Sequence, residues 1–336
     1  MLKKYSGNPI LRPDSVQFPW ANLKVYNSGM IVDNGVYHMF FRAVGSEDFI
    51  SRIGHGKSID GIHFEIDPKP VLSPKESFET HGCEDPRITK IGKIYYMTYT
   101  AFEGRTGRAA ISSSQDFKNW GKRRLLLSDW HGSRWNTKSG RPVQLPNFNT
   151  STWDQEKDSN WSKAAAIFSE KVNGKYMLLF GDDSIWSAMS DDLIDWKINP
   201  EPIISPREGF FDQGYVEMGP PPFKTEEGWL IFYHGINRLD NQRVYCIAAA
   251  MLDLVDPTKI LWRSSNPLIE PKEIYEISGM VDITDKRAGG KLPKAVFCSG
   301  AIETKTKPNH SYNLYYSGAD TVICLASGTL EEIKWK

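Results

Sequence analysis

The chain has 336 residues, of which 40% are hydrophobic, and its 41 Lys and Arg residues balance its 41 Asp and Glu residues. A neutral chain without a basic run is a poor partner for nucleic acid or for an anionic membrane surface. No apolar window reaches the length of a membrane span, and the first residues lead into no apolar stretch typical of secretion signals.

The cysteines Cys83, Cys246, Cys298 and Cys324 are dispersed, without the paired spacing of a zinc site. They predict a reduced, cytoplasmic protein. The length and composition predict one large domain over residues 1–336.

Along the chain, a turn led by Gly, Asn or Ser opens a strand of alternating aromatic and aliphatic residues five times, and a second short strand follows each. The first strands cover 34–41, 92–99, 173–180, 228–233 and 311–316. The second strands cover 53–64, 109–120, 185–196, 246–254 and 322–330. The irregular spacing of several tens of residues suits blades rather than a solenoid of near-identical units.

A third element also recurs, a short apolar run with proline on both sides, at 8–13, 69–74, 201–206 and 266–271. Proline cannot donate into a strand ladder, so these runs predict edge strands and linkers. Five such units predict an all-β fold, a five-bladed β-propeller with a polar axial funnel. An all-β sandwich is the alternative, since amphipathic strands resemble one another.

Two insertions interrupt the pattern. The first, at about 129–161, holds Trp130, Trp135, Trp153 and Trp161 among polar residues and has no strand periodicity. It is either a functional loop whose rings stack on sugars or a surface loop held by its own aromatics. The second, at about 282–293, is basic and rich in glycine.

The segment 82–88 places Glu84, Asp85 and Arg87 immediately before an apolar strand. Pro86 predicts an extended Asp85 at the strand entrance, from where its carboxyl can point into the funnel. Cleavage of a glycosidic bond needs a carboxylic acid that stays protonated near neutral pH, and burial beside Glu84 predicts that state for Asp85. The structural alternative is an Asp-Pro-Arg turn closed by an ion pair.

The segment 82–88 and the Tyr-rich strand after it, 95–102, resemble the signature of glycoside hydrolase family 130, the β-mannoside phosphorylases and β-mannosidases. The resemblance continues through 168–176, 185–196, 219–222, 228–235, 252–259 and 315–321. It implies a five-bladed propeller, inversion at the mannosyl carbon, and Asp85 as a general acid that passes its proton through a sugar hydroxyl.

The same resemblance implies residues that hold the sugar or the phosphate. The predicted sugar-binding residues are Asn27, Arg42, Glu84, Arg87, Asp212, Tyr233 and Asp320. The predicted phosphate-binding residues are Arg108, Lys163 and His234, and the turn around Cys298 also resembles phosphorylases. Any sugar-binding residue could instead be closing a blade.

Two features of the sequence argue against phosphate as a co-substrate. Many phosphorylases have His-Arg-Pro where this chain has Phe180-Gly-Asp-Asp. Glu217 stands where phosphorylases usually have a small residue, and its carboxylate could repel phosphate and serve as general base for a water. Alternatively, Glu217 pairs with Lys163 or Arg108 at the rim of the pocket.

The leading prediction is phosphorolysis of β-manno-oligosaccharides to mannose 1-phosphate, with Asp85 as the acid. The alternatives are an inverting β-mannosidase that uses Glu217 as its base, and a non-catalytic carbohydrate-binding propeller. No metal or cofactor is expected apart from inorganic phosphate as co-substrate, since the chain has no paired-histidine motif. The sequence leaves open the linkage, the acceptor sugar and whether the protein is a homo-oligomer.

Overall fold

The computed structural model describes residues 2–128, 130, 162–239, 242–278, 294–306 and 308–334, with the backbone of 135–136 and 141–142. The predicted insertions at 129–161 and 282–293 lie outside the described residues, except for Trp130 and one short hairpin. That hairpin pairs β10 (Trp135–Asn136) with β11 (Arg141–Pro142).

In the described residues, antiparallel pairing joins the strands outside the β10–β11 hairpin into five groups of four or five strands. The first group contains β2 (Lys24–Asp33), β3 (Val36–Val44), β4 (Ser51–Ser58) and β5 (Glu65–Ile66). The second contains β6 (Gly82–Ile91), β7 (Ile94–Phe102), β8 (Gly107–Ser114) and β9 (Gly121–Leu125). The third contains β12 (Ala166–Ile167), β13 (Tyr176–Phe180), β14 (Trp186–Ser190) and β15 (Lys197–Ile198).

The fourth group contains β16 (Tyr215–Met218), β18 (Trp229–Leu239), β19 (Gln242–Leu252) and β20 (Ile260–Arg263), and β17 (Phe223–Lys224) pairs with the start of β18. The fifth contains β21 (Lys294–Lys305), β22 (Ser311–Gly318), β23 (Val322–Thr329) and β1 (Lys3–Lys4). Short parallel contacts join β4 to β6 and β19 to β21. The helical elements are η1 (Pro13–Ser15), η2 (Ser77–Glu79), α2 (Ile274–Ile277) and α3 (Leu330–Lys334).

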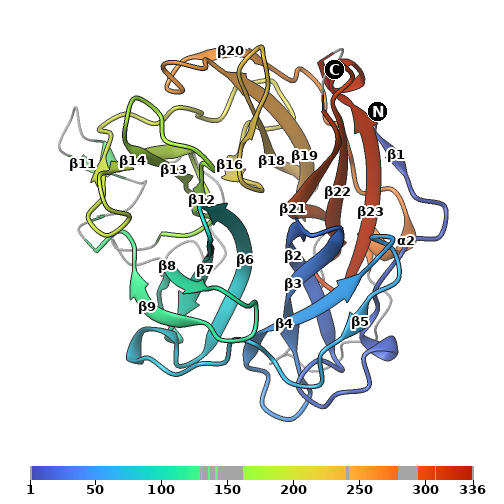
Figure 1. The fold of residues 1–336 in the computed structure, drawn as a ribbon. Coiled ribbons are helices and arrows are strands. Elements are labelled where there is room, and N and C mark those ends of the chain that lie inside the picture. Colours follow the sequence, from blue (N-terminus) through green and yellow to red (C-terminus); the bar gives the residue numbers. More distant parts are fainter. Residues whose placement is uncertain are drawn as a thin grey trace.

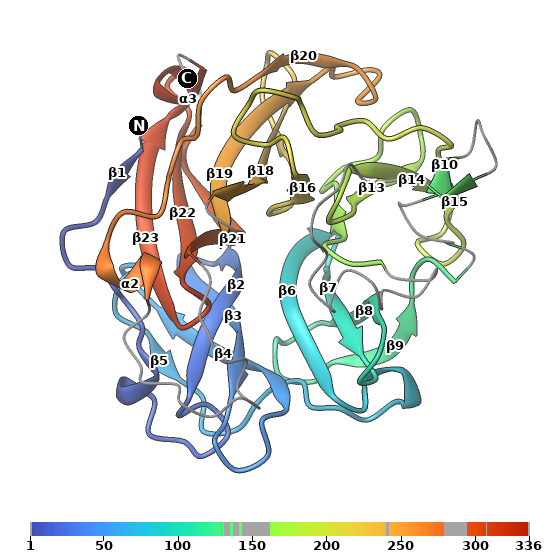
Figure 2. The same cartoon turned by 180° about the vertical axis from the view of Figure 1, so that it is seen from behind.

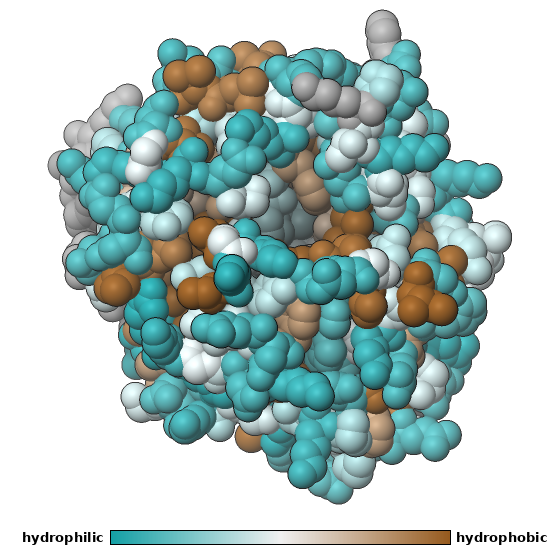
Figure 3. Space-filling view, viewed as in Figure 1, coloured by the Kyte–Doolittle hydropathy of each residue, from teal (hydrophilic) through white to brown (hydrophobic). Residues whose placement is uncertain are grey.

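The all-β prediction is confirmed, and the groups follow one another around the centre of the molecule (Figures 1 and 2). Strands β2, β6, β12, β16 and β21 lie nearest to that centre (Figure 1). The face seen in Figure 1 is hollowed near its middle, with hydrophilic side chains over much of the surrounding surface (Figure 3).

The predicted turns have the backbone geometry that their residues favour. Asn34 and Gly35 join β2 to β3 with φ of 49° and 78°, and Asn173 and Gly174 precede β13 with φ of 50° and 80°. Two consecutive positive φ values are typical of the tight hairpin turn that Asn-Gly prefers. The proline-flanked runs form single β-bridges rather than edge strands, with Leu72 opposite Ile53 as one example. Proline at both ends removes the donors that a longer ladder needs.

The hydrophobic core lies between neighbouring groups. Each of five clusters combines buried side chains from two groups: Phe40 with Tyr99, Ile111 with Phe180, Met177 with Tyr233, Phe232 with Tyr316, and Tyr315 with Phe41. Each group therefore packs on the next one, and the fifth packs on the first. Side chains of this size each contribute about 1.5–3 kcal/mol on full burial.

Three acids, Glu79, Asp212 and Glu276, lie fully buried in the connectors that enter the second, fourth and fifth groups. Each accepts a hydrogen bond from a tyrosine of the group's second strand: from Tyr99 at 2.6 Å, from Tyr233 at 2.8 Å and from Tyr316 at 2.8 Å. Each also pairs with a cation on or beside the outermost strand: Arg123, Arg263 and Lys4. We call these three arrangements the buried acid clusters, and they fix each connector to both sides of its group.

Glu79→Ala is expected to lower the free energy of unfolding by about 3–5 kcal/mol, because it leaves the largely buried guanidinium of Arg123 without its carboxylate. The measurement is urea unfolding. Glu65→Ala is the matched control, since the pair of Glu65 with Lys57 is exposed, and such pairs contribute about 0–1 kcal/mol. Equal losses in the two variants would show that the cluster around Glu79 does not stabilise the fold.

Candidate active site

Asp85 and Asn27 lie at matching bulges near the starts of β6 and β2. The strand register shifts between Glu84 and Arg87 and between Tyr26 and Ser28, and the two residues have φ of 52° and 46°. The prediction of an extended Asp85 was therefore wrong: the bulge turns the residue into the left-handed region. Such backbone strain in a residue other than Gly concentrates at functional sites. Asn27 Nδ2 donates to Asp85 Oδ1 at 2.7 Å.

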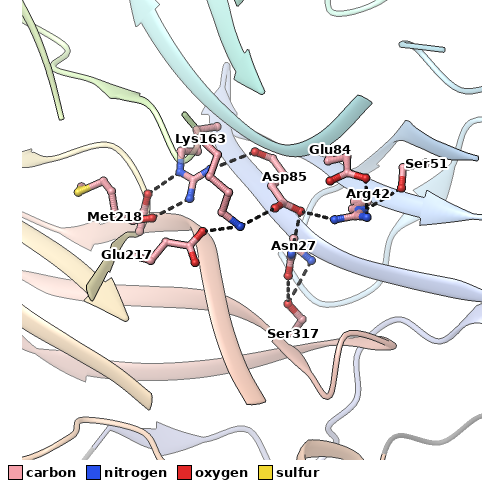
Figure 4. Close-up of polar contacts among 11 residues, drawn as sticks. Asn27, Arg42, Ser51, Glu84, Asp85, Lys163, Glu217, Met218 and Ser317 are labelled. Carbon is pink, nitrogen blue, oxygen red and sulfur yellow. Dashed lines mark hydrogen bonds and ion pairs between the residues drawn. The ribbon is translucent and has the colours of Figure 1, made fainter. Parts of the chain in front are cut away.

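One guanidinium holds the two adjacent carboxylates (Figure 4). Arg42, from β3, donates to Glu84 Oε1 at 2.6 Å and to Asp85 Oδ1 at 3.3 Å. Its Nε donates to Ser51 at 3.0 Å, and its guanidinium carbon lies 4.8 Å from the ring centre of Tyr26. Arg42 is thereby fixed from three directions and is a positioning group for both carboxylates.

Lys163 lies between two carboxylates that come from different groups (Figure 4). Its Nζ is 2.9 Å from Glu217 Oε1 on β16 and 4.0 Å from Asp85 Oδ2 on β6. Glu217 is 3% exposed, so it is an interior residue and not a rim residue as one alternative had it. That alternative also paired Glu217 with Lys163 or Arg108, and the structure shows the pair with Lys163.

His234 lies directly opposite Glu217 in the β16–β18 ladder. The backbone N–H of Cys298 donates to its Nε2 at 2.8 Å, and its ring stacks on Phe297 with 3.9 Å between centroids. Because Nε2 accepts, the proton of the neutral ring is on Nδ1. Among the described residues Nδ1 has no hydrogen-bond partner. Burial, with Arg87 and Lys163 nearby, holds the pKa of His234 well below its usual value, so the ring is neutral.

The carboxyl groups of the site differ in their charge state. Burial opposes ionisation of Asp85, but Arg42, Lys163 and the bond from Asn27 outweigh burial and lower its pKa. Burial raises the pKa of Glu84 and that of Asp320, and it raises the pKa of Glu217 to about 7 against the opposing effect of Lys163. The prediction that Asp85 itself is kept protonated was therefore wrong for the ligand-free protein, because two hydrogen-bond donors, Asn27 and Arg42, and the charge of Lys163 act on its carboxylate.

Arg87 is buried, and its guanidinium donates hydrogen bonds to backbone carbonyl oxygens. It donates to the carbonyl oxygens of Gly219 at 2.7 Å, Met218 at 2.7 Å and Asp85 at 3.1 Å. These bonds tie β6 to the end of β16 and so fix Asp85 relative to Glu217. A role of Arg87 in sugar binding remains a prediction.

The remaining predicted residues lie apart from this centre or at its edge. Asp212 and Tyr233 belong to a buried acid cluster, where Arg207 and Arg263 hold the carboxylate. In the described part of the chain, no hydrogen bond or ion pair links Asp212, Tyr233 or Arg108 to Asp85. The binding roles of these three residues remain predictions. Asp320, in the turn after β22, interacts electrostatically with Lys24, Arg42 and Asp85.

Three contributors were missed by the sequence analysis. Ser317 accepts from the backbone N–H of Asn27 and donates to its Oδ1, which orients the amide toward Asp85. Ser51 fixes Arg42, and the charge of Asp182 acts on both Lys163 and Glu217. Ser317 lies within the matching segment 315–321, so that segment carried a signal for it.

Over the described ranges, no three His, Cys, Asp or Glu side chains gather in a way that could hold a metal ion. The same ranges contain no helix long and apolar enough to cross a membrane.

Known proteins resemble this chain along its whole length. The model of glycoside hydrolase family 130, described as beta-1,4-mannooligosaccharide phosphorylase, matches residues 3–334. A 1,2-beta-oligomannan phosphorylase of Thermoanaerobacter sp. is 34% identical, and a beta-1,2-mannobiose phosphorylase of the same organism is 36% identical, each over 99% of both chains. The structure of a beta-1,2-mannobiose phosphorylase from Listeria innocua with beta-1,2-mannobiose superposes with a TM-score of 0.76 at 27% identity, covering 99% of this chain and 98% of the other. The chain belongs to glycoside hydrolase family 130.

Proposed function

We propose that the protein is a phosphorylase that cleaves β-1,2-linked manno-oligosaccharides into mannose 1-phosphate and a shortened oligosaccharide. The observation that carries the proposal is Lys163 between Asp85 and Glu217, together with neutral His234, whose Nδ1–H has no partner among the described residues. A cation and a fixed donor in a buried site suit a phosphate oxyanion. The names of the two Thermoanaerobacter relatives support the β-1,2 linkage.

In this proposal a phosphate oxygen attacks the mannosyl carbon, and the glycosidic oxygen takes a proton that originates from Asp85. A phosphate that pairs with Lys163 weakens the interaction of this lysine with Asp85, and it also brings negative charge close to Asp85. Both effects raise the pKa of Asp85. The bound substrate thus converts Asp85 into an acid. Asn27, Arg42, Glu84 and Asp320 lie around Asp85 and would fix the sugar hydroxyl groups.

We further infer that the five groups are the blades of a single propeller whose axial funnel holds the site. The packing of each group on the next, and of the fifth on the first, supports this arrangement. We infer a cytoplasmic location, because a charged sugar phosphate made outside the cell would be lost to it. All four cysteines are free and buried, in keeping with that location.

The test is to incubate the protein with β-1,2- and β-1,4-mannobiose, with and without inorganic phosphate, and to assay mannose and mannose 1-phosphate. We expect mannose 1-phosphate from the β-1,2 disaccharide only when phosphate is present. Free mannose at a rate independent of phosphate would instead identify a hydrolase with Glu217 as its base. No turnover of either disaccharide under any condition would favour a carbohydrate-binding protein.

A further inference from the structure

Glu217 lies beside the two groups that hold the phosphate in the proposed function, Lys163 and His234. Its carboxyl is 2.9 Å from Lys163 Nζ, and its partner across the ladder is His234. Directly paired residues of antiparallel strands project from the same side of the sheet, with Cβ atoms about 4.5–5.5 Å apart. A phosphate held by Lys163 and His234, as the proposed function requires, therefore lies against the carboxyl of Glu217.

An ionised Glu217 would oppose that phosphate. Two unit charges about 4 Å apart interact by about 4 kcal/mol at the effective dielectric constant of a protein surface. A protonated Glu217 has the reverse effect, since its O–H becomes a donor to a phosphate oxygen.

The surroundings of Glu217 make the protonated form accessible. Burial raises its pKa to about 7, Lys163 and Arg87 oppose that rise, and Asp182 adds to it. Of the other ionisable groups of the site, Asp85 lies 4.0 Å from Lys163, and His234 is neutral because its pKa is lowered. Arg42, Glu84 and Asp320 interact with Asp85. The negative charge of an arriving phosphate raises the pKa of Glu217 further.

We propose that phosphate and one proton bind together, and that Glu217 holds the proton as a neutral carboxylic acid whose O–H donates to a phosphate oxygen. The equilibrium is balanced: ionised Glu217, one proton and hydrogen phosphate give protonated Glu217 bound to hydrogen phosphate. Lys163 is then free to direct its charge at the phosphate. This inference rests on the proposed function, and it makes a carboxyl at this position compatible with phosphorolysis.

Sulfate is the probe, because it has the shape and charge of hydrogen phosphate but does not titrate between pH 6 and 9. Its inhibition constant against phosphate is measured over that range. We expect the constant to rise about tenfold per pH unit above about pH 7, where Glu217 has lost its proton. The raised pKa of Lys163 and the lowered pKa of His234 keep both groups from titrating in this range.

Glu217→Gln replaces the O–H donor by an N–H donor that does not titrate, so its sulfate constant is expected to be independent of pH. Glu170→Gln is the matched control, since it makes the same change at an exposed pair with Lys224, and it should keep the wild-type slope. A wild-type constant that does not change with pH, or a Glu217→Gln variant that keeps the slope, would overturn the inference.

Calorimetry of the Asp85→Asn variant, in which residue 85 cannot take up a proton, decides the question even if Glu217→Gln does not fold. Sulfate is titrated at pH 8 in two buffers of different ionisation enthalpy, and uptake of about one proton per sulfate is expected. No proton uptake overturns the inference. Failure of the proposed function is a separate result, because it appears as a wild-type protein that makes no mannose 1-phosphate.

Discussion

Asp85→Asn is expected to lower kcat for phosphorolysis of β-1,2-mannobiose by about 10²–10⁴-fold, the usual contribution of a general acid. The amide keeps the shape of the side chain, and its oxygen still accepts from Asn27 and Arg42, which bind the carboxylate at 2.7 and 3.3 Å. The fold and sugar binding should therefore persist while the proton is lost. Steady-state rates and calorimetric binding of mannobiose measure the two effects separately.

Asp48→Asn is the matched control, since Asp48 also pairs with an arginine, Arg52, but on the surface. It should leave the rate within about twofold, since exposed pairs contribute little. An aryl β-mannoside whose leaving group needs no proton should lose far less rate in Asp85→Asn than mannobiose does. If both substrates lost rate equally, or if the variant kept its rate on mannobiose, Asp85 would not be the acid.

Lys163→Met should raise KM for phosphate by about 10²–10³-fold with a smaller change in kcat. Methionine keeps the length of the stem but removes the cation that contacts both Glu217 and Asp85. Losing one partner of a buried charge interaction costs about 3–5 kcal/mol, and 1.4 kcal/mol is a factor of ten in affinity. The measurement is the rate as a function of phosphate at saturating mannobiose.

Lys175→Met removes a lysine from an exposed pair with Asp191 and serves as the control, with no expected change in KM. A Lys163→Met variant whose kcat falls while KM for phosphate stays constant would show that Lys163 acts only through Asp85. The double variant Lys163→Met, Glu217→Gln should unfold at a higher temperature than Lys163→Met, because it leaves no buried carboxylate without its cation.

Much of the fold could be predicted from the sequence because the longer strands alternate strongly. The predicted strands at 34–41, 92–99 and 311–316 overlap β3, β7 and β22. The outermost strands β5 and β15 have two residues each and leave too short a pattern to find. The buried acid clusters did leave a signal, Pro-Lys-Glu followed by an aromatic residue and Glu, at 74–79 and 271–276, and that signal was overlooked.

The sequence pointed to the residues that directly contact Asp85, but it missed Ser317, Ser51 and Asp182, and it did not give the charge states of the carboxyl groups. The motif around Asp85 and its resemblance to family 130 pointed to the residues that the structure gathers there. The lowered pKa of Asp85 depends on Asn27, Arg42 and Lys163, which lie far apart in the sequence, and local reasoning about Glu84 could not include them. The left-handed backbone of Asp85 depends on a bulge, which proline preferences alone do not predict.

The pairing of β1 with β23 determines when the fifth group can be completed during synthesis. Lys3 and Lys4 pair with Ser327 and Ala326. Strand β1 therefore cannot pair until the ribosome has made β23. At roughly 5–20 residues per second, the ribosome needs roughly 15–60 s to make the intervening chain. During that time the first and second groups can form, but the fifth cannot. The fifth group is therefore completed only after β23 has been made, when β1 pairs with it.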